Sequence, residues 1–357
     1  MSDALHPSQV EEEFTRALGV LSLDADRYPN LLAAINLSAT RVERAREVLK
    51  NELGEPDPPI DVVAFGSMAR FEMTPASDFD YLVIAYGLDV QPGAYRRTLT
   101  IADNLRATIG EANDIRKPGT SGLFGIMVSA PDLVDVIGLE RDTNHSHSRR
   151  VLLLEESVSL YDPAKHARLI EAIIGRYLEA RPPSASGMPR FLLNDLARYW
   201  RTLSIDYQAK TPPPARYSLR YLKLLISRKF TYASALAPLM TVVLAEHPDL
   251  HTSLCDAYSR PPILRMLDLG AVLHSKGDTS AVRAIAQTLD VTDEFNGLLG
   301  QQEWRDRVKR ECTETNDPRA PTEFARARKL ARQLQTHLEE VFFSETLAPI
   351  ARKYLTF

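Results

Sequence analysis

Two short apolar runs set among helical stretches constrain the fold of this chain most strongly. Residues 61–65 and 81–85 are rich in β-branched and aromatic side chains, and turn-forming residues flank both runs. Runs of this length and composition predict buried strands. A further strand is expected over 123–128, after a helical pattern between 92 and 109. Strands that alternate with helices indicate an α/β or α+β core.

The rest of the chain predicts helices. Helical patterns cover about 7–18 and 30–53, and the second ends at Gly54, which is followed by prolines that cannot continue it. Beyond about residue 148 every pattern is helical. We therefore expect an α+β protein with N-terminal helices over 1–59, a small mixed β-sheet core over 60–147, and an all-helical domain over 148–357.

Length and composition are those of an ordinary globular protein. The 357 residues are 44% hydrophobic and 25% charged, enough for a sizeable core. The net charge of −4 argues against a protein whose whole surface binds nucleic acid. Cys255 and Cys312 lie far apart, so neither a disulfide framework nor a cysteine zinc site is expected.

The chain shows no sequence signal for a membrane. Its first ten residues are polar, and no run approaches the roughly 20 apolar residues that span a bilayer. We therefore expect a cytoplasmic protein that does not contact membranes. Leu330, Leu334 and Leu338 form an apolar stripe on the last long helix, which predicts core packing and could also form an oligomer contact.

The segment from Gly66 to Asp80 carries the chemistry. It contains Gly-Ser, ten intervening residues, and then Asp-Phe-Asp at the start of the second apolar run. Side chains two residues apart leave the same face of a strand, so Asp78 and Asp80 should project together, and Phe79 and Tyr81 the other way. Two carboxylates on one face repel each other unless a cation lies between them, and such oxygen ligands favour Mg²⁺, or Mn²⁺. The alternative is that Asp78 only caps a turn.

Gly66 and Ser67 predict a phosphate site. They follow the first strand and open a short helix expected from Ser67 to about Met73. Glycine lets the backbone approach a phosphate closely, and the free N–H groups of a helix start face the anion. The Ser67 hydroxyl can add a hydrogen bond, and Arg70 is a further candidate for the nucleotide site. A triphosphate beside metal-binding carboxylates is what two-metal nucleotidyl transfer requires.

This combination resembles the signature of the DNA polymerase β superfamily of nucleotidyltransferases. It is most similar to the branch that holds glutamine synthetase adenylyltransferase and PII uridylyltransferase. In that branch a third acid lies on a later strand, before a Gly-rich loop, and Asp114 stands in a similar segment. The resemblance implies that Asp114 is the third metal ligand and the general base. Asp114 could instead be a solvated loop residue, with Asp132 and Asp135 as the other candidates for the third acid.

The resemblance is strongest over about 60–130, and the chain departs from the named relatives elsewhere. It has one Gly-Ser/Asp-x-Asp unit where the adenylyltransferase has two. It has no His-Asp doublet, so the phosphohydrolase domain of the uridylyltransferase is not expected. Glutamine synthetase and PII are therefore doubtful acceptors.

A basic stretch lies in the helical half. Between Arg190 and Phe230 there are nine Lys or Arg against two acids. A basic helix across a cleft from the carboxylates would neutralise a triphosphate, whereas the alternative is a solvated face. The candidates for nucleotide contacts are Arg220, Lys223, Arg228 and Lys229.

The expected activity is transfer of a nucleoside monophosphate from an NTP, with ATP the expected donor, to a hydroxyl of a protein, an RNA or a small molecule. Within enzymes, the alternatives are a synthase of an oligonucleotide or cyclic nucleotide signal and a tRNA-modifying toxin. In another class, the chain could be a catalytically silent nucleotide-binding regulator.

Overall fold

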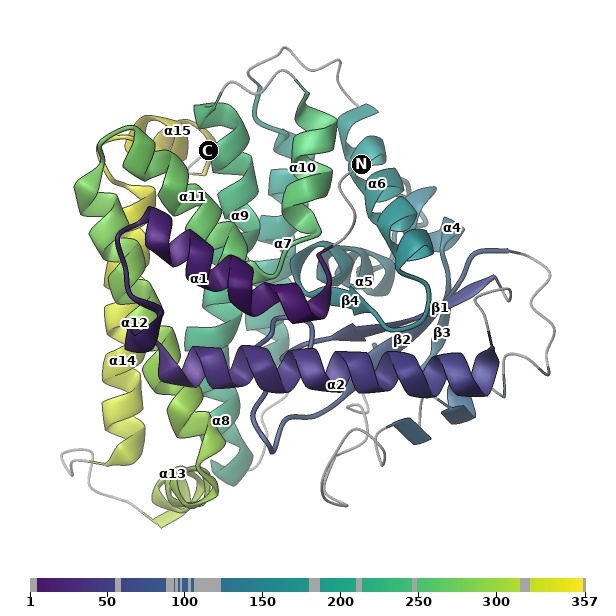
Figure 1. Ribbon diagram of the computed structural model, residues 1–357, viewed down its shortest axis with the longest axis horizontal. Coiled ribbons are helices and arrows are strands. Elements are labelled where there is room, and N and C mark those ends of the chain that lie inside the picture. Colours follow the sequence, from purple (N-terminus) through teal and green to yellow (C-terminus); the bar gives the residue numbers. More distant parts are fainter. Residues whose placement is uncertain are drawn as a thin grey trace. The chain divides into compact units, whose positions relative to one another are not determined.

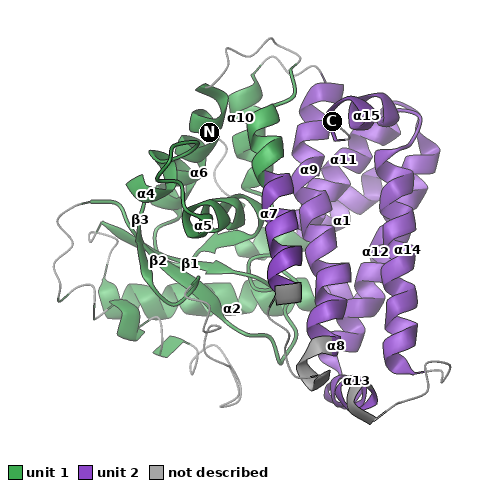
Figure 2. Ribbon diagram, turned by 180° about the vertical axis from the view of Figure 1, so that it is seen from behind, with its two compact units in different colours: residues 1–11, 34–195, 247–261 green, residues 12–33, 196–246, 262–357 purple. Residues whose placement is uncertain are grey.

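The computed structural model describes residues 5–54, 59–87, 93, 96, 98–101, 104–105, 123–179, 187–209, 214–245, 249–314 and 322–355. The chain forms two compact units, coloured separately in Figure 2. Unit 1 comprises residues 1–11, 34–195 and 247–261, and unit 2 comprises 12–33, 196–246 and 262–357. The three domains expected from the sequence stay a prediction.

Unit 1 is built on a mixed four-stranded sheet with the order β3-β2-β1-β4. The strands are β1 (Ile60–Phe65), β2 (Asp80–Ala85), β3 (Met127–Ser129) and β4 (Ser157–Ser159). Strand β1 pairs antiparallel with β2 and β4, and β2 pairs parallel with β3. The α+β class with a small mixed sheet is thereby confirmed.

The two later strands differ from the sequence expectation. Strand β3 begins at Met127 and not at residue 123, because Gly125 adopts a φ of +73° that interrupts the extended conformation of the chain. Strand β4 lies in a part of the chain where only helices were expected. Its three residues are too few to show an alternating pattern, and only pairing with β1 identifies them as a strand.

One face of the sheet packs against α2 (Pro29–Leu53), the long helix beside the strands in Figure 1. Alternate residues of β1 and β2 enter this core together with apolar residues of α2 and two residues of the 93–105 segment. The fully buried members include Val42, Ala45, Leu49, Val62, Ala64, Val83 and Leu105. The two-residue period of the strands therefore fixes which side chains are covered on this face.

The other helices of unit 1 are α4 (Pro131–Val134), α5 (Asn144–Glu155), α6 (Pro163–Glu179) and α10 (Leu250–Tyr258), with the short turn Pro7–Gln9 near the N-terminus. The buried Arg150 guanidinium joins several of these elements. It donates to both carboxylate oxygens of Asp142, at 3.0 and 2.7 Å, to the Tyr177 hydroxyl at 2.8 Å, and to Asp195 at 3.2 Å. A buried cation is tolerated here because its partners lie in good hydrogen-bonding geometry.

Asp61 forms a second buried polar centre at the start of β1. Its Oδ1 accepts hydrogen bonds from the Ser159 hydroxyl at 2.9 Å and from the amides of Tyr161 and Asp162 at 3.2 and 2.9 Å. Its Oδ2 is buried without a hydrogen-bond partner among the residues that the structure describes. Burial raises the pKa of this carboxyl to about 7, against the lowering effect of these hydrogen bonds.

Unit 2 consists of helices in its described part. They are α1 (Val10–Val20, from residue 12), the short turn Ala25–Arg27, α7 (Arg190–Ala209, from residue 196), α8 (Pro214–Lys223), a π-helical segment (Leu224–Arg228), α9 (Lys229–Leu244), α11 (Pro262–Ser275), α12 (Thr279–Gly300), α13 (Gln302–Glu314), α14 (Glu323–Phe342) and α15 (Ala348–Tyr354). A π-helical turn thus joins α8 to α9. Across all described residues, no helix is long and apolar enough to cross a membrane.

Candidate active site

The strand register brings Asp80 to the turn that follows β1. Phe65, the last residue of β1, pairs with Asp80, the first residue of β2, and Gly66 follows Phe65 directly. Gly66 has a φ of +67°, and a Cβ placed on it would lie 3.5 Å from Asp80 Oδ2. The Asp80 carboxylate therefore lies against the backbone of the Gly66 turn. The Asp78 and Asp80 metal site expected from the sequence stays a prediction.

The two aromatic neighbours of Asp80 lie in the core. Phe79 and Tyr81 are only 1% and 2% exposed, and their rings stack with centroids 5.3 Å apart, within the cluster that contains α2. Asp80 is partly exposed and Asp78 is exposed. This is the alternation predicted from the sequence, in which burial of Phe79 and Tyr81 directs the acidic residues away from that core.

A separate turn precedes Asp78. The amide of Thr74 donates to the Ser77 hydroxyl at 2.9 Å, and the Ser77 amide donates to the Thr74 carbonyl at 3.0 Å. Ser77 thus closes this turn through its own hydroxyl. The alternative function of Asp78 as its cap is therefore not needed.

The segment after Gly66 is one helical turn, shorter than the helix expected to about Met73. The Arg70 amide donates to the Gly66 carbonyl and the Glu72 amide to the Ser67 carbonyl, both at 2.9 Å. Phe71 then adopts a φ of +58°, which ends the turn. The Arg70 amide is the first to donate a hydrogen bond within this turn. The amides of Ser67 and Met68 therefore form no hydrogen bond inside the turn. Amides at the start of a helical turn are groups that can bind an anion.

Arg70 has protein partners of its own. Its guanidinium donates to Glu72 at 2.9 Å and forms an ion pair with Glu156, and all three side chains are buried. Glu156 directly precedes β4, so this cluster ties the Gly66 turn to the edge of the sheet. The expected contact of Arg70 with a nucleotide stays a prediction, because the buried carboxylates already engage this cation.

Phe124 is a residue of the site that the sequence did not indicate. Its ring lies 5.4 Å from that of Phe65, and the amide of the next residue, Gly125, donates to the Tyr81 carbonyl at 2.8 Å. Phe124 is partly exposed and therefore presents an aromatic surface near the Gly66 turn. In the sequence it stood within a Gly-rich segment, and only pairing beside β2 reveals its position.

The donor set at Asp78 and Asp80 fits a hard divalent cation. Both residues supply carboxylate oxygens, the ligands that Mg²⁺ and Mn²⁺ prefer. The absence of a side chain at Gly66 leaves open the space beside Asp80 Oδ2 that a methyl group would fill. Within the described residues, no group of three His, Cys, Asp or Glu side chains is arranged to hold a metal ion. Asp114 lies outside the described residues.

The other candidates for a third acid lie at the far end of β2. Strand β3 pairs Met127 with Val83 and Ser129 with Ala85, so the chain runs away from Asp80 before it reaches Asp132. Asp132 and Asp135 are exposed at α4. Asp132 lines a pocket of about 290 Å³ together with Ser129, Arg141 and Arg149. This position does not bring either acid beside Asp80.

The four basic candidates belong to unit 2. Arg220 and Lys223 are exposed on α8, and Arg228 ends the π-helical segment. Lys229 donates to the Gln335 side chain at 2.7 Å, and burial lowers the pKa of its ammonium. Their contact with a nucleotide stays a prediction.

Comparison with known proteins supports the class of activity. Residues 13–112 match a family model described as "Putative nucleotidyltransferase DUF294". This segment contains Gly66, Ser67, Asp78 and Asp80 and ends before Asp114. The match supports a nucleotidyltransferase-like family and general nucleotidyl transfer. A search of curated proteins found no match.

Proposed function

We propose that this protein is a metal-dependent nucleotidyltransferase that moves a nucleoside monophosphate from an NTP to a hydroxyl acceptor and releases pyrophosphate. One observation carries the proposal, namely that the Asp80 carboxylate lies against the turn at Gly66. The matched family model is consistent with this chemistry. We also propose that the chain is related to the branch of glutamine synthetase adenylyltransferase and PII uridylyltransferase, because its motif is similar to theirs.

The two acidic residues would hold the metal. Asp78 and Asp80 would bind Mg²⁺ or Mn²⁺, which supplies charge neutralisation for the triphosphate and lowers the pKa of the acceptor hydroxyl. Asp80 would be held in position by its place in β2, because Phe65 pairs with it and the next residue, Tyr81, is buried in the core. A carboxylate fixed by strand pairing needs little reorganisation when the substrate binds.

The turn would hold the phosphates. The amides at Ser67 and Met68 would donate to β- or γ-phosphate oxygens, and the Ser67 hydroxyl would add a further hydrogen bond. Gly66 would let the phosphate approach the backbone because it has no Cβ. The acceptor oxygen forms the new bond to the α-phosphorus as the bond between that phosphorus and the bridging oxygen of pyrophosphate breaks. Asp114 would accept the acceptor's proton.

We propose ATP as the donor of the nucleoside monophosphate. The acceptor would be a hydroxyl of a protein, an RNA or a small molecule. A synthase of an oligonucleotide or cyclic signal and a tRNA-modifying toxin would use the same residues with another acceptor. A silent nucleotide-binding regulator would not require two carboxylates beside a phosphate turn, so we favour an enzyme.

Labelling identifies both donor and acceptor. The purified chain is incubated with Mg²⁺ and each α-labelled NTP in turn, alone and with cell lysate, and label is followed into protein, RNA and small molecules. We expect transfer with one preferred nucleotide, loss of transfer on removal of divalent ions with EDTA, and recovery when Mg²⁺ is restored.

A matched pair of variants tests the site. Asp80→Asn should lower transfer at least about a hundredfold without altering the melting temperature by more than a few degrees, because the amide keeps the shape but loses the charge that binds metal. Asp26→Asn is the control, since Asp24-Ala-Asp26 is a second Asp-x-Asp that is exposed and lies apart from any strand. Equal activities of these two variants would refute the proposed metal site.

A further inference from the structure

A row of aromatic rings crosses three helices of unit 2. Tyr207 of α7 lies 5.7 Å from Tyr221 of α8, and Tyr221 lies 6.4 Å from Phe324 of α14, measured between ring centroids. All three side chains are partly exposed. The row therefore joins residues more than a hundred positions apart, and each of them keeps part of its surface exposed.

The elements around this row are strongly basic. The described parts of α8, α13 and the first half of α14, residues 218–223, 302–311 and 322–332, contain ten Lys or Arg and four Asp or Glu. This is an excess of six positive charges in a chain whose net charge is −4. Helix α13 packs against α8 and α14, and α14 also contacts α8, so the three segments gather at one end of unit 2, as Figures 1 and 2 show.

Several of these cations are available to a ligand. Arg220, Arg307, Arg328, Lys329 and Arg332 are exposed, and the ion pairs between described residues in these helices, such as Asp306–Lys309 and Glu323–Arg326, do not include them. Two of the acidic residues form ion pairs with other cations of these helices: Asp306 with Lys309 at 3.1 Å and Glu323 with Arg326 at 2.8 Å.

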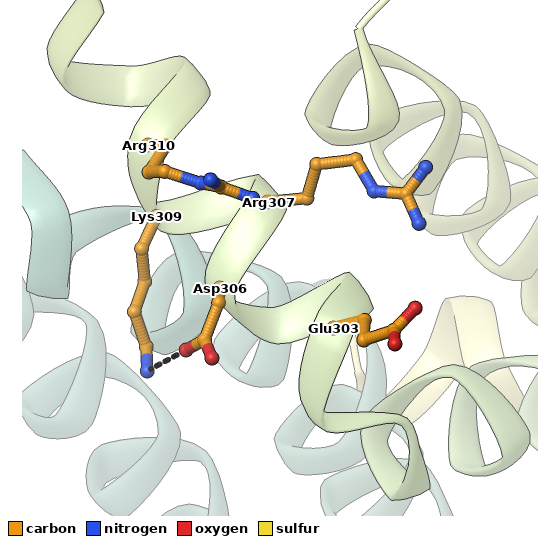
Figure 3. A pocket seen from close by; sticks show the side chains of 5 residues that line it. All are labelled: Glu303, Asp306, Arg307, Lys309 and Arg310. Atoms are coloured by element: carbon orange, nitrogen blue, oxygen red, sulfur yellow. Dashed lines mark hydrogen bonds and ion pairs between the residues drawn. The ribbon is translucent and has the colours of Figure 1, made fainter.

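Helix α13 carries both an internal ion pair and exposed cations. Five of its side chains line an open hollow of about 610 Å³, namely Glu303, Asp306, Arg307, Lys309 and Arg310. In Figure 3, Lys309 turns toward Asp306, whereas the guanidinium of Arg307 extends away from both. The lining contains three cations and two acids, an excess of one positive charge.

We propose that this end of unit 2, formed by the ring row Tyr207–Tyr221–Phe324 and the basic residues of α8, α13 and α14, binds a single-stranded nucleic acid. Cations that follow a phosphate backbone, combined with aromatic rings on which bases stack, form the surface that single strands recognise. A base can stack on such a ring only when it is unpaired, which favours a single strand over a duplex. The surface lies wholly in unit 2, so this proposal does not depend on the transfer reaction.

Binding is measured by fluorescence anisotropy with the full-length protein. The probes are a labelled single-stranded RNA of about 20 nucleotides, a DNA of the same sequence, and the corresponding RNA duplex, each over a range of KCl concentrations. We expect both single strands to bind more tightly than the duplex, with affinity falling steeply as salt rises, because each neutralised phosphate of a single strand contributes about −0.7 to the slope of log K against log salt. Tighter binding of the RNA than of the DNA would identify single-stranded RNA as the ligand of this surface.

A pair of double variants with equal charge change locates the surface. Arg307→Glu with Arg328→Glu should weaken RNA binding at least about tenfold at moderate salt and make the salt slope shallower by roughly 1.4, the loss of two phosphate contacts. Lys276→Glu with Arg283→Glu is the control, because these residues are exposed, Lys276 in the turn before α12 and Arg283 near the start of α12, roughly 28 Å along that helix from α13. We expect the control to change affinity less than twofold.

A third variant separates stacking from charge. Tyr221→Leu retains apolar bulk for packing and removes the ring, and should weaken single-strand binding about fivefold or more while leaving the salt slope unchanged. Asp80→Asn should bind RNA as the unaltered protein does, so a failed transfer site and a failed nucleic-acid surface give different results. The proposal is overturned if no oligonucleotide binds at low salt, if the duplex or anionic vesicles bind in place of single strands, or if both charge-reversed variants bind equally.

Discussion

Replacement of Gly66 by alanine tests the geometry on which the proposed reaction depends. Gly66 has a φ of +67°, where a side chain costs about 1–2 kcal/mol. The new methyl group would lie 3.5 Å from Asp80 Oδ2, an ordinary van der Waals distance, so no steric clash adds to this backbone cost. We therefore expect a loss of about 1–2 kcal/mol in unfolding free energy and a decrease in melting temperature of roughly 2–8 °C.

The effect on activity should be much larger than the effect on stability. The methyl group would fill the space beside the Asp80 carboxylate that the proposed metal and phosphate require. We expect nucleotidyl transfer to fall at least about a hundredfold, equivalent to about 2.7 kcal/mol or more in transition-state stabilisation. Thermal unfolding and label transfer from the preferred NTP measure the two effects in the same preparation.

Gly54→Ala is the matched control. Gly54 also has a positive φ, of +86°, but a Cβ there would meet nothing within 4 Å. This variant should lose similar stability and keep its activity. If Gly66→Ala loses no more activity than Gly54→Ala, the space beside Asp80 does not hold substrate or metal, and the reasoning about this site is wrong.

Two further predictions concern buried charge. Arg70→Met removes the cation that pairs with the buried Glu72 and Glu156. It should lower the unfolding free energy by about 3–5 kcal/mol, measured as a lower melting temperature. A raised KM for NTP at unchanged stability would instead indicate that Arg70 contacts the nucleotide. Burial raises the pKa of Asp61 to about 7, so the folded state holds its proton longer than the unfolded state, and this residue's contribution to stability should decline as pH rises from about 4 to 7. Asp61→Asn should remove that part of the decline in urea unfolding, and identical pH profiles of the variant and the unaltered protein would exclude it.

The local pattern accounts for the parts of the site that lie close together in the sequence. Phe79 and Tyr81 enter the core and Asp80 does not, because neighbouring side chains on a strand point to opposite faces. The position of Gly66 beside Asp80 follows from the pairing of two short strands that the sequence identifies. The single helical turn after Gly66 is shorter than expected, since nothing in the pattern predicts the positive φ at Phe71.

Contacts between distant residues were not predictable in the same way. The sequence suggested a nucleotide for Arg70, whereas the structure gives it Glu156, which lies 86 positions later. Asp61 appeared to be part of an apolar run, and only the approach of β4 and the start of α6 explains its burial. The nearness of Phe124 to Phe65 likewise depends on the pairing of residues 125 and 126 with β2.

The sequence by itself determined the α+β class, the two strands that Gly66 and Asp80 adjoin, and the burial of Tyr81, because strand alternation and helix periodicity are local and repeat every two or 3.6 residues. Tertiary structure alone decided that Arg70 is bound by buried carboxylates, that Phe124 lies beside Phe65, and that Tyr207, Tyr221 and Phe324 form one row. These arrangements join segments far apart along the chain, and their geometry is set by the packing of helices and strands, which no local period encodes.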